Sequence, residues 1–342
     1  MIIRLTVLER LLHRLHLLPT PIMDAFGGII FGRVLTIAVR RGLFEAVADR
    51  PRSVHEIAEA TRFHPRAVEL MADAFLTGGY LQRKGSCYLV SDDARTWLLR
   101  RSPQYIGNLV QYFETLYTRW GNFEHSLDHG SPARAYFDLF SEEDWRIYVY
   151  GMRDLAALLL PHLEPKLVLG GVPTSLLDLG GSHGMYAISL CRRYPTLHAI
   201  VADFPSALAH TRGFAAAEGM TERITTLAGD FRHAAFPSNL DAVLMFNVIH
   251  GFQEEENREL IVRARGALKP GGKLFILDQM KDTRRRSQLG ALVPLLVGLN
   301  LLNEIGGTVY EAGDVMRWCS AFTSVRGHRV RLPGIVLVEA VR

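Results

Sequence analysis

The second half of the sequence alternates between short apolar runs and amphipathic segments, and this rhythm constrains the fold more than any other feature. Apolar runs typical of buried strands lie at residues 175–179, 198–202, 224–228, 242–246 and 273–277. Segments with helical spacing of apolar residues lie between them, at 185–193, 206–218 and 254–268. Strands separated repeatedly by helices form a parallel sheet with right-handed crossovers. The sequence therefore predicts an α/β domain over 166–342, closed by a strand pair at 326–330 and 335–340.

The N-terminal part has a different pattern, in which short helices precede a hairpin. Ser53 and Glu56 have the spacing of a capping box in front of one predicted helix. A second helix follows, and then two short strands around a turn signal at 84–86. This order is typical of a winged-helix module, which we expect to extend over 1–105. A connection of longer helices is expected at 106–165.

Charge argues against the DNA-binding role that a winged helix suggests. The net charge is only +4 over 342 residues. In the helix that would enter a groove, three basic residues near its start are followed by two acids: Arg62, His64, Arg66, Glu69 and Asp73. Duplex recognition usually requires a basic stripe or patch. We therefore expect this module to serve in dimerisation or as a substrate lid, and we expect no nucleic-acid partner.

Residue patterns also bear on location and metals. Charged and histidine residues interrupt 1–18, which instead has helical spacing of its leucines, from Leu5 to Leu15, and predicts an amphipathic helix that needs a partner surface. The apolar run at 289–302 is shorter than the ~20 residues of a membrane span. The three cysteines lie far apart and no HExxH occurs. These patterns predict a cytoplasmic protein with no membrane contact and no metal.

A glycine-rich turn follows the first predicted strand, in the stretch Asp178-Leu-Gly-Gly-Ser-His-Gly184. Glycines let a backbone turn sharply and approach a ligand closely at the carboxyl end of a parallel sheet. Asp203 ends the second strand, where a carboxylate can accept both hydroxyls of a ribose. Asp230 and Phe231 end the third, where an acid and an aromatic ring can hold an adenine. The turn alone would suit a nicotinamide cofactor equally well.

Five motifs in order, DLGGSHG, VADFP, AGDF, VIHGF and LKPGGKLFILD, resemble those of the S-adenosylmethionine-dependent O-methyltransferases of the plant caffeate and bacterial natural-product type. The resemblance covers nearly the whole chain. It implies a Rossmann-like catalytic domain, an N-terminal winged-helix dimerisation domain, a homodimer and a small-molecule acceptor. By the resemblance, Gly180 and Gly184 would line the methionine part of S-adenosylmethionine, Asp203 the ribose, and Asp230 with Phe231 the adenine.

The resemblance also implies the residues that act on the acceptor. His250 stands where the family has the histidine that removes a proton from the acceptor hydroxyl, and an imidazole with a pKa near 6.5 suits this task. Asp278 stands where the family has an acid that orients the ring. Met152 resembles the methionine near the substrate and the sulfonium. His183, inside the glycine turn, is expected to face solvent, with contact to the cofactor carboxylate as the alternative.

The chain departs from the family pattern around the expected base. Gly251 and Phe252 follow His250 where the family has Asp and Trp, and Phe246 replaces a basic residue. The family's Glu-Arg-Thr run after a glycine pair reads here as Thr-Val-Tyr-Glu at 308–311, so the second orienting acid is missing from its usual place, and whether Glu311 substitutes for it is open.

The acceptor is therefore less defined than the transferred group. A helix at 289–302 is expected to cover the acceptor pocket, which favours a small, largely apolar acceptor. We expect a hydroxyl, with sulfur or carbon as alternatives. Another alternative is a decarboxylase, hydroxylase or cyclase that keeps the cofactor as a charged fixture. Outside the enzymes, the alternative is a transcription regulator.

Overall fold

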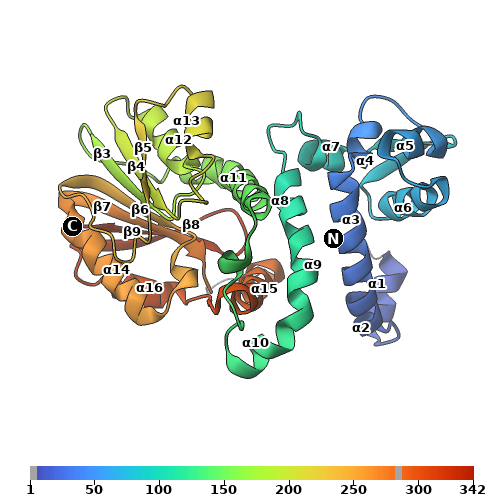
Figure 1. Ribbon diagram of the computed structural model, residues 1–342. Coiled ribbons are helices and arrows are strands. Elements are labelled where there is room, and N and C mark those ends of the chain that lie inside the picture. The colour runs from blue at the N-terminus through green and yellow to red at the C-terminus, as the bar shows by residue number, and fades with distance from the viewer. Residues whose placement is uncertain (1–5, 282–286) are drawn as a thin grey trace. The chain divides into compact units, whose positions relative to one another are not determined.

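The computed structural model describes residues 6–281 and 287–342 (Figure 1). The chain divides into two compact units, Met1–Thr118 and Arg119–Arg342. The boundary between them falls inside the segment 106–165 that the sequence predicts as a helical connection. Leu5, the first leucine of the predicted amphipathic helix, lies outside the described residues.

The larger unit contains a seven-stranded sheet. Its strands lie side by side in the order β5 (Ile224–Ala228), β4 (His198–Asp203), β3 (Ser175–Leu179), β6 (Leu240–Phe246), β7 (Leu268–Gln279), β9 (Ile335–Val341) and β8 (Ser324–Arg329). Strands β3 to β7 are parallel, whereas β9 is antiparallel to both of its neighbours. The predicted Rossmann-like α/β fold and its closing strand pair are confirmed.

The strand order fixes where a ligand can bind. From β3 the chain moves outward to β4 and β5, and it then returns to place β6 on the other side of β3. The order therefore reverses between β3 and β6. In open α/β sheets, ligands bind outside the carboxyl ends of the strands at such a reversal.

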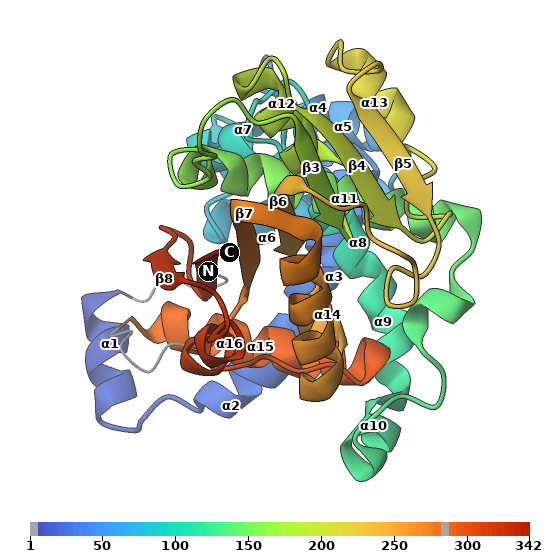
Figure 2. The same cartoon turned by 90° about the vertical axis from the view of Figure 1, so that its left-hand side faces the viewer.

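Helices cover both faces of the sheet because successive side chains of a strand point to opposite faces (Figures 1 and 2). On β6, Ala242, Leu244 and Phe246 belong to one core. The helices of that core are α11 (Glu142–Leu163), α12 (Met185–Arg193) and α13 (Thr211–Ala217). Val243 and Met245 belong to the other core, with α14 (Glu254–Ala267) and α16 (Ala312–Trp318). The strand is buried along its whole length, as its unbroken apolar run requires.

Local signals determine where the main helices begin and end. Ser141 and Asp144 form a capping box at the start of α11, and Gln253 and Glu256 do so for α14. The apolar run predicted as a helix forms α15 (Gln288–Ile305), which ends at Gly306 in a left-handed conformation. The predicted helix at 206–218 is longer than the observed α13, because residues 205–210 form turns. The remaining helical segments of this unit are η3 (Trp120–Asn122), α10 (Phe123–His129), η4 (Tyr136–Leu139) and η5 (Ile249–Gly251).

The smaller unit is helical with one hairpin. Its elements are α1 (Val7–Arg14), α2 (Thr20–Ile22), η1 (Met23–Gly27), α3 (Gly28–Arg40), α4 (Leu43–Ala46), α5 (Val54–Thr61), α6 (Pro65–Thr77), β1 (Leu81–Lys84), β2 (Cys87–Val90), α7 (Asp92–Leu98), α8 (Gly107–Tyr112) and η2 (Phe113–Thr115); α9 (Leu116–Arg119) ends at the boundary. The capping box of Ser53 and Glu56 forms as predicted. Strands β1 and β2 pair antiparallel around the predicted turn.

Within residues 6–281 and 287–342, two helical segments reach the length and apolar character of a membrane span, whereas the sequence patterns predicted none. They are Thr20–Arg40, which continues through α2, η1 and α3, and Gln288–Ile305, which is α15. Both carry polar groups that take part in the fold. Arg33 of α3 donates to Glu114 at 2.8 Å, and α15 buries Glu304.

Candidate active site

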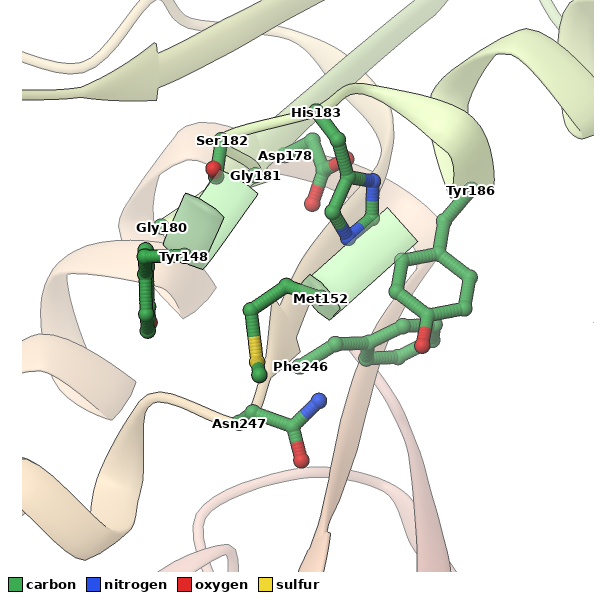
Figure 3. A pocket seen from close by; sticks show the side chains of 10 residues that line it. All are labelled: Tyr148, Met152, Asp178, Gly180, Gly181, Ser182, His183, Tyr186, Phe246 and Asn247. Atoms are coloured by element: carbon green, nitrogen blue, oxygen red, sulfur yellow. The ribbon is translucent and has the colours of Figure 1, made fainter. Parts of the chain in front are cut away.

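A small cavity lies at the point where the strand order reverses, at the carboxyl ends of β3 and β6 (Figure 3). Ten residues line it: Tyr148, Met152, Asp178, Gly180, Gly181, Ser182, His183, Tyr186, Phe246 and Asn247. Helix α11 contributes the first two, and β3 contributes Asp178. The next four lie in the turn after β3, Tyr186 lies on α12, and the last two lie at the end of β6 and directly after it. The cavity therefore brings together two of the predicted residues, Gly180 and Met152.

The turn after β3 requires glycine at two positions. Gly180 has a φ of +66° and Gly184 a φ of +68°, in the left-handed region that glycine adopts most easily. A Cβ on Gly180 would lie 2.7 Å from a methyl carbon of Val248, and the Phe231 ring lies 3.8 Å from the same point. The turn is thus packed tightly, and the predicted Phe231 lies beside the predicted Gly180.

Asp203 connects the second strand to this turn. One of its carboxylate oxygens accepts a hydrogen bond from the Ser182 N–H at 3.0 Å, and the other accepts one from the Phe204 N–H at 2.7 Å. The side chain is buried, and burial raises the pKa of Asp203 to about 6, although the two N–H groups act in the opposite direction. Asp203 therefore stabilises the glycine turn in addition to its expected contact with a ribose.

Asp230 is half-buried, and its strongest contacts are local. The Arg232 guanidinium donates to both of its oxygens, the shortest contact being 2.7 Å. These bonds lower the pKa of the Asp230 carboxyl. Phe231 is buried and meets the ring of Phe252 edge-on, with ring centres 5.9 Å apart. Phe231 thus reaches the glycine turn, whereas the carboxylate of Asp230 is held by Arg232.

Asp178 lines the cavity with a buried carboxyl group. Its side chain is fully buried, and among the residues that the structure describes its donor is the Ala187 N–H, which lies outside normal hydrogen-bond geometry and lowers the pKa only slightly. Burial and the nearby Asp203 charge raise the pKa of Asp178 to about 8. A buried acceptor of this kind is a natural partner for a donor group of a ligand. The ammonium group of the methionine part of S-adenosylmethionine is such a donor, and the sequence prediction did not assign Asp178 to the site.

His183 does not face solvent, so the expectation for this residue is wrong. The side chain is buried in the wall of the cavity, because the turn folds back under the start of α12. Its Nδ1 accepts the Met185 N–H at 3.1 Å, so in the neutral ring the proton is on Nε2. Burial and the charge of Arg153 lower the pKa of His183 to about 3. The ring is therefore a neutral donor at physiological pH, which leaves contact with a cofactor carboxylate as its predicted role.

Asn247 and Tyr148 are further lining residues that the sequence analysis did not identify. Asn247 has a φ of +54°, an uncommon conformation for a residue other than glycine and one that asparagine tolerates. It follows β6 directly. Tyr148 lies one helical turn before Met152 on α11. Its spacing from Met152 could have predicted that Tyr148 faces the same site, whereas no pattern in the sequence indicated Asn247.

His250 and Asp278 form the second part of the site. His250 lies on η5, after β6, and its Nδ1 is 2.6 Å from an oxygen of Asp278 near the end of the adjacent strand β7. Its backbone N–H donates to the other oxygen of Asp278 at 3.3 Å. The Asp278 side chain is completely buried, and that of His250 is 17% exposed. Burial lowers the pKa of His250, but the charge and hydrogen bond of Asp278, assisted by Glu304, outweigh it and leave the pKa raised.

This pairing leaves one imidazole nitrogen for chemistry. The Asp278 carboxylate accepts a hydrogen bond from Nδ1–H, so a neutral His250 ring keeps its proton on Nδ1 and carries an unprotonated Nε2. Such a nitrogen can accept a proton from a bound hydroxyl. Among the described residues, no group of three or more histidine, cysteine, aspartate or glutamate side chains is arranged to hold a metal ion.

Comparison with known proteins agrees with this chemistry. Residues 123–319 match the O-methyltransferase domain family. The chain is 29% identical over 320 residues to a 3-hydroxy-5-methyl-1-naphthoate 3-O-methyltransferase of Streptomyces sahachiroi, covering 90% of this chain and 91% of that protein. It is 29% identical over 314 residues to an N,N-dimethyltransferase, OxyT, of Streptomyces rimosus, covering 86% and 90%.

A solved structure supports the fold over the full length. Human N-acetylserotonin methyltransferase in complex with S-adenosylmethionine superposes with a TM-score of 0.83 at 21% identity, covering 99% of this chain and 98% of that one. Because the family match spans more than half of the chain, this protein belongs to the O-methyltransferase family and is an S-adenosylmethionine-dependent methyltransferase.

Proposed function

We propose that this enzyme transfers a methyl group to a hydroxyl of a small, largely apolar molecule, with His250 as the general base. The observation that carries this proposal is the 2.6 Å contact between His250 Nδ1 and Asp278, which leaves Nε2 free to accept a proton. A correctly placed imidazole with a pKa near neutral pH is an effective base for a hydroxyl. When bound, S-adenosylmethionine supplies a methyl group on a positively charged sulfur.

The residues of the chain perform the steps that this transfer requires. His250 takes the hydroxyl proton on Nε2, and Asp278 keeps the ring oriented and stabilises the imidazolium that results. Because the fold holds His250 and Asp278 in fixed positions, the acceptor, the cofactor and the base react within one complex and do not have to meet in solution. Met152 in the cavity wall is proposed to contact both the acceptor and the sulfur end of the cofactor.

The cofactor residues are assigned along the carboxyl edge of the sheet. We place the methionine part against Gly180 and Gly184, with its ammonium group at Asp178 and its carboxylate at His183. Asp203 then accepts the ribose hydroxyls. Phe231 packs on the adenine, and Asp230 accepts from its amino group in competition with Arg232. Each assignment uses a group that is buried or fixed by hydrogen bonds.

The acceptor is proposed to be aromatic or otherwise apolar. Aromatic and thioether side chains form much of the cavity wall, including Tyr148, Met152 and Phe246. The naphthoate O-methyltransferase similarity supports a hydroxyl. Relatives also include an N,N-dimethyltransferase, so the acceptor atom follows from the pocket and not from the family alone. Sulfur and carbon acceptors stay as alternatives, as does use of the cofactor as a non-transferring fixture.

We further propose that the enzyme is a cytoplasmic homodimer whose N-terminal winged-helix module serves in dimerisation. Helix α1 buries none of its residues, and its apolar side chains are largely exposed, with Val7 at 77% and Leu8 at 64%. Apolar patches of this kind usually mark an interface with another protein. A second subunit is also proposed to cover the exposed leucines of α15, and we therefore expect no membrane contact there. We also expect no nucleic-acid partner.

The proposed reaction is tested by following both products. The purified enzyme is incubated with S-adenosylmethionine and a panel of small hydroxylated aromatic compounds, together with amine and thiol analogues. We expect S-adenosylhomocysteine and a methylated hydroxyl compound in equal amounts. Conversion of an acceptor without S-adenosylhomocysteine would support the non-transferring alternative, and methylation confined to amines or thiols would reject the hydroxyl assignment.

A further inference from the structure

Helix α15 carries a buried acid near the base. Glu304 lies on its last turn and is 7% exposed, although most of the helix is apolar and several of its leucines face outward. A charged side chain is rarely buried to this extent without a role in a network of charges or hydrogen bonds. The position of Glu304 therefore requires an explanation, which the expected roles of the family residues do not give.

The end of α15 is attached to the backbone of the base. After the helix ends at Gly306, the Thr308 N–H donates to the His250 carbonyl at 2.9 Å. A Cβ on Gly307 would lie 2.3 Å from that same carbonyl oxygen, so the two segments are in direct contact. Glu304 lies on the last turn of the helix, shortly before this contact. Its place relative to η5 is consequently fixed by the fold.

The charge of Glu304 also reaches two side chains of the site. Burial lowers the pKa of His250, and Asp278 with a smaller effect of Glu304 raises it. Burial and the Asp203 charge raise the pKa of Tyr148 in the cavity wall, and Glu304 makes a smaller contribution in the same direction. These two residues come from separate elements, η5 and α11. These directions agree with the geometry, in which α15 packs against η5.

Glu311, the acid nearest in sequence to the missing family residue, is placed differently from Glu304. Val309 is an apolar, buried residue in the segment where the family has its second acid. Glu311 is the N-cap of α16 and pairs through its backbone with Lys281 in an isolated bridge. Unlike Glu304, Glu311 is not among the groups that change the pKa of His250.

The other elements packed on η5 present neutral groups to its backbone. Asn257 of α14 donates to the Ile249 carbonyl at 2.9 Å, and the Tyr310 hydroxyl donates to the Phe252 carbonyl at 2.6 Å. Charge reaches the His250 ring from Asp278 of β7 and from Glu304 of α15. These two carboxylates approach from different elements of the fold.

We propose that Glu304 is a positioning residue of the base, a second carboxylate that acts with Asp278 to stabilise the protonated form of His250. It would take over the role of the acid that the chain lacks at the usual place. This inference rests on the proposed function of His250, but the electrostatic coupling of Glu304 to His250 can be measured without the acceptor.

The test is an NMR titration of histidine rings labelled with ¹³C at Cε1 in the full-length protein. The chain has 13 histidines, and the spectrum of His250→Asn identifies the His250 signal. We expect Glu304→Gln to lower the titration midpoint of His250 by roughly 0.5–1 pH unit, because an opposite charge nearby favours the imidazolium. Glu304→Asp should restore most of the shift. Glu311→Gln is the matched control and should leave the midpoint unchanged.

Other variants keep the result interpretable. Asp278→Asn should lower the midpoint more than Glu304→Gln does, which shows that the measurement detects a lost carboxylate. If Glu304→Gln does not fold, Glu304→Met, which removes the charge and keeps a side chain of similar length, is compared with Glu311→Met; only the change at position 304 should lower the midpoint. An unchanged midpoint in folded Glu304→Gln, with a clear shift in Asp278→Asn, would overturn the proposal.

Kinetic measurements distinguish the proposed role of Glu304 from the proposed role of His250 as general base. Once an acceptor is known, the acidic limb of the rate profile should move to lower pH in Glu304→Gln, with a reduced kcat and little change in the KM for cofactor. If His250→Ala keeps its activity, the base assignment fails whatever the titration shows. If His250→Ala is inactive and the titration midpoint of His250 is the same in Glu304→Gln as in wild type, only the role of Glu304 is rejected.

Discussion

His250 and Asp278 come from adjacent parallel strands, one beyond the end of β6 and one near the end of β7, and they meet through a 2.6 Å contact between Nδ1 and a carboxylate oxygen. The carboxylate is fully buried, whereas the ring keeps limited exposure. The fold therefore holds the ring in one orientation and leaves Nε2 as its free nitrogen.

From this contact we expect His250→Ala to lower kcat by about 10²–10⁴-fold, the usual range for a positioned acid–base group. Asp278→Asn should cost less, because it only weakens the orientation of the ring and the stabilisation of imidazolium. Cofactor affinity, measured by calorimetry, should hardly change in either variant. A His250→Ala enzyme of near wild-type kcat would instead indicate an acceptor that arrives deprotonated.

The pH dependence of kcat follows from the raised pKa of His250. Only the neutral ring accepts a proton, so the rate should rise with pH and level off above the folded-state pKa, at a midpoint above the ordinary 6.5. The profile of His250→Ala should lack this inflection. Identical profiles for the two proteins would exclude His250 as the titrating base.

Asp203 is expected to dominate ribose recognition. Its carboxylate can accept two ribose hydroxyls, and hydrogen bonds to a charged acceptor contribute roughly 1.5–3 kcal/mol each. Asp203→Ala should therefore weaken binding of S-adenosylhomocysteine by about 100-fold or more in calorimetry. Because Asp203 also accepts the Ser182 N–H, Asp203→Asn serves as the control for an altered turn. Wild-type affinity in a folded Asp203→Ala protein contradicts the assignment.

Asp178 should couple cofactor binding to proton release. Its pKa of about 8 means that the free protein holds this carboxyl mostly protonated at pH 7, and an ammonium group prefers the ionised form. Affinity for S-adenosylhomocysteine should therefore increase from pH 6 to 8, by at most about tenfold per unit. Calorimetry in buffers of different ionisation enthalpy should detect the released proton. Asp178→Asn should bind weakly and lose this release.

The same raised pKa makes a separate prediction for stability. The folded-state pKa of Asp178 lies above its ordinary value of 3.8. The contribution of the protonated side chain to the free energy of unfolding is therefore fully present below about pH 3.8. It is lost as the pH rises through about 8. Thermal melts should show that Asp178→Asn is more stable than wild type at pH 9, and a lower Tm at that pH would argue against an energetic cost of ionising this buried carboxyl group.

The exposed apolar residues of the N-terminal segment predict an intersubunit interface. Deletion of residues 1–30 should give a weaker dimer or an insoluble chain, because the truncation removes a surface that a second copy is proposed to cover. Sedimentation at micromolar concentration distinguishes the outcomes. A soluble truncated protein together with a monomeric full-length protein would refute the interface.

Sequence alone determined the elements whose signals are local. The strand at 175–179 and the helix at 185–193 occur at their predicted boundaries, because a buried apolar run and a helical period are fixed by neighbouring residues. The family motifs likewise predicted His250 and Asp278 before their contact was visible. A capping box such as that of Ser53 and Glu56 is equally local.

Tertiary structure decided which side chains are buried and what lies next to them. His183 reads as a solvent-facing turn residue, yet the turn after β3 folds under α12 and buries it. Glu304 is 54 residues from His250 in the chain, and only the packing of α15 on η5 brings its charge to the ring. Desolvation and Coulomb interactions depend on distance in space and not on separation along the chain. The ionisation of Asp178, His183 and His250 therefore became predictable only from the fold.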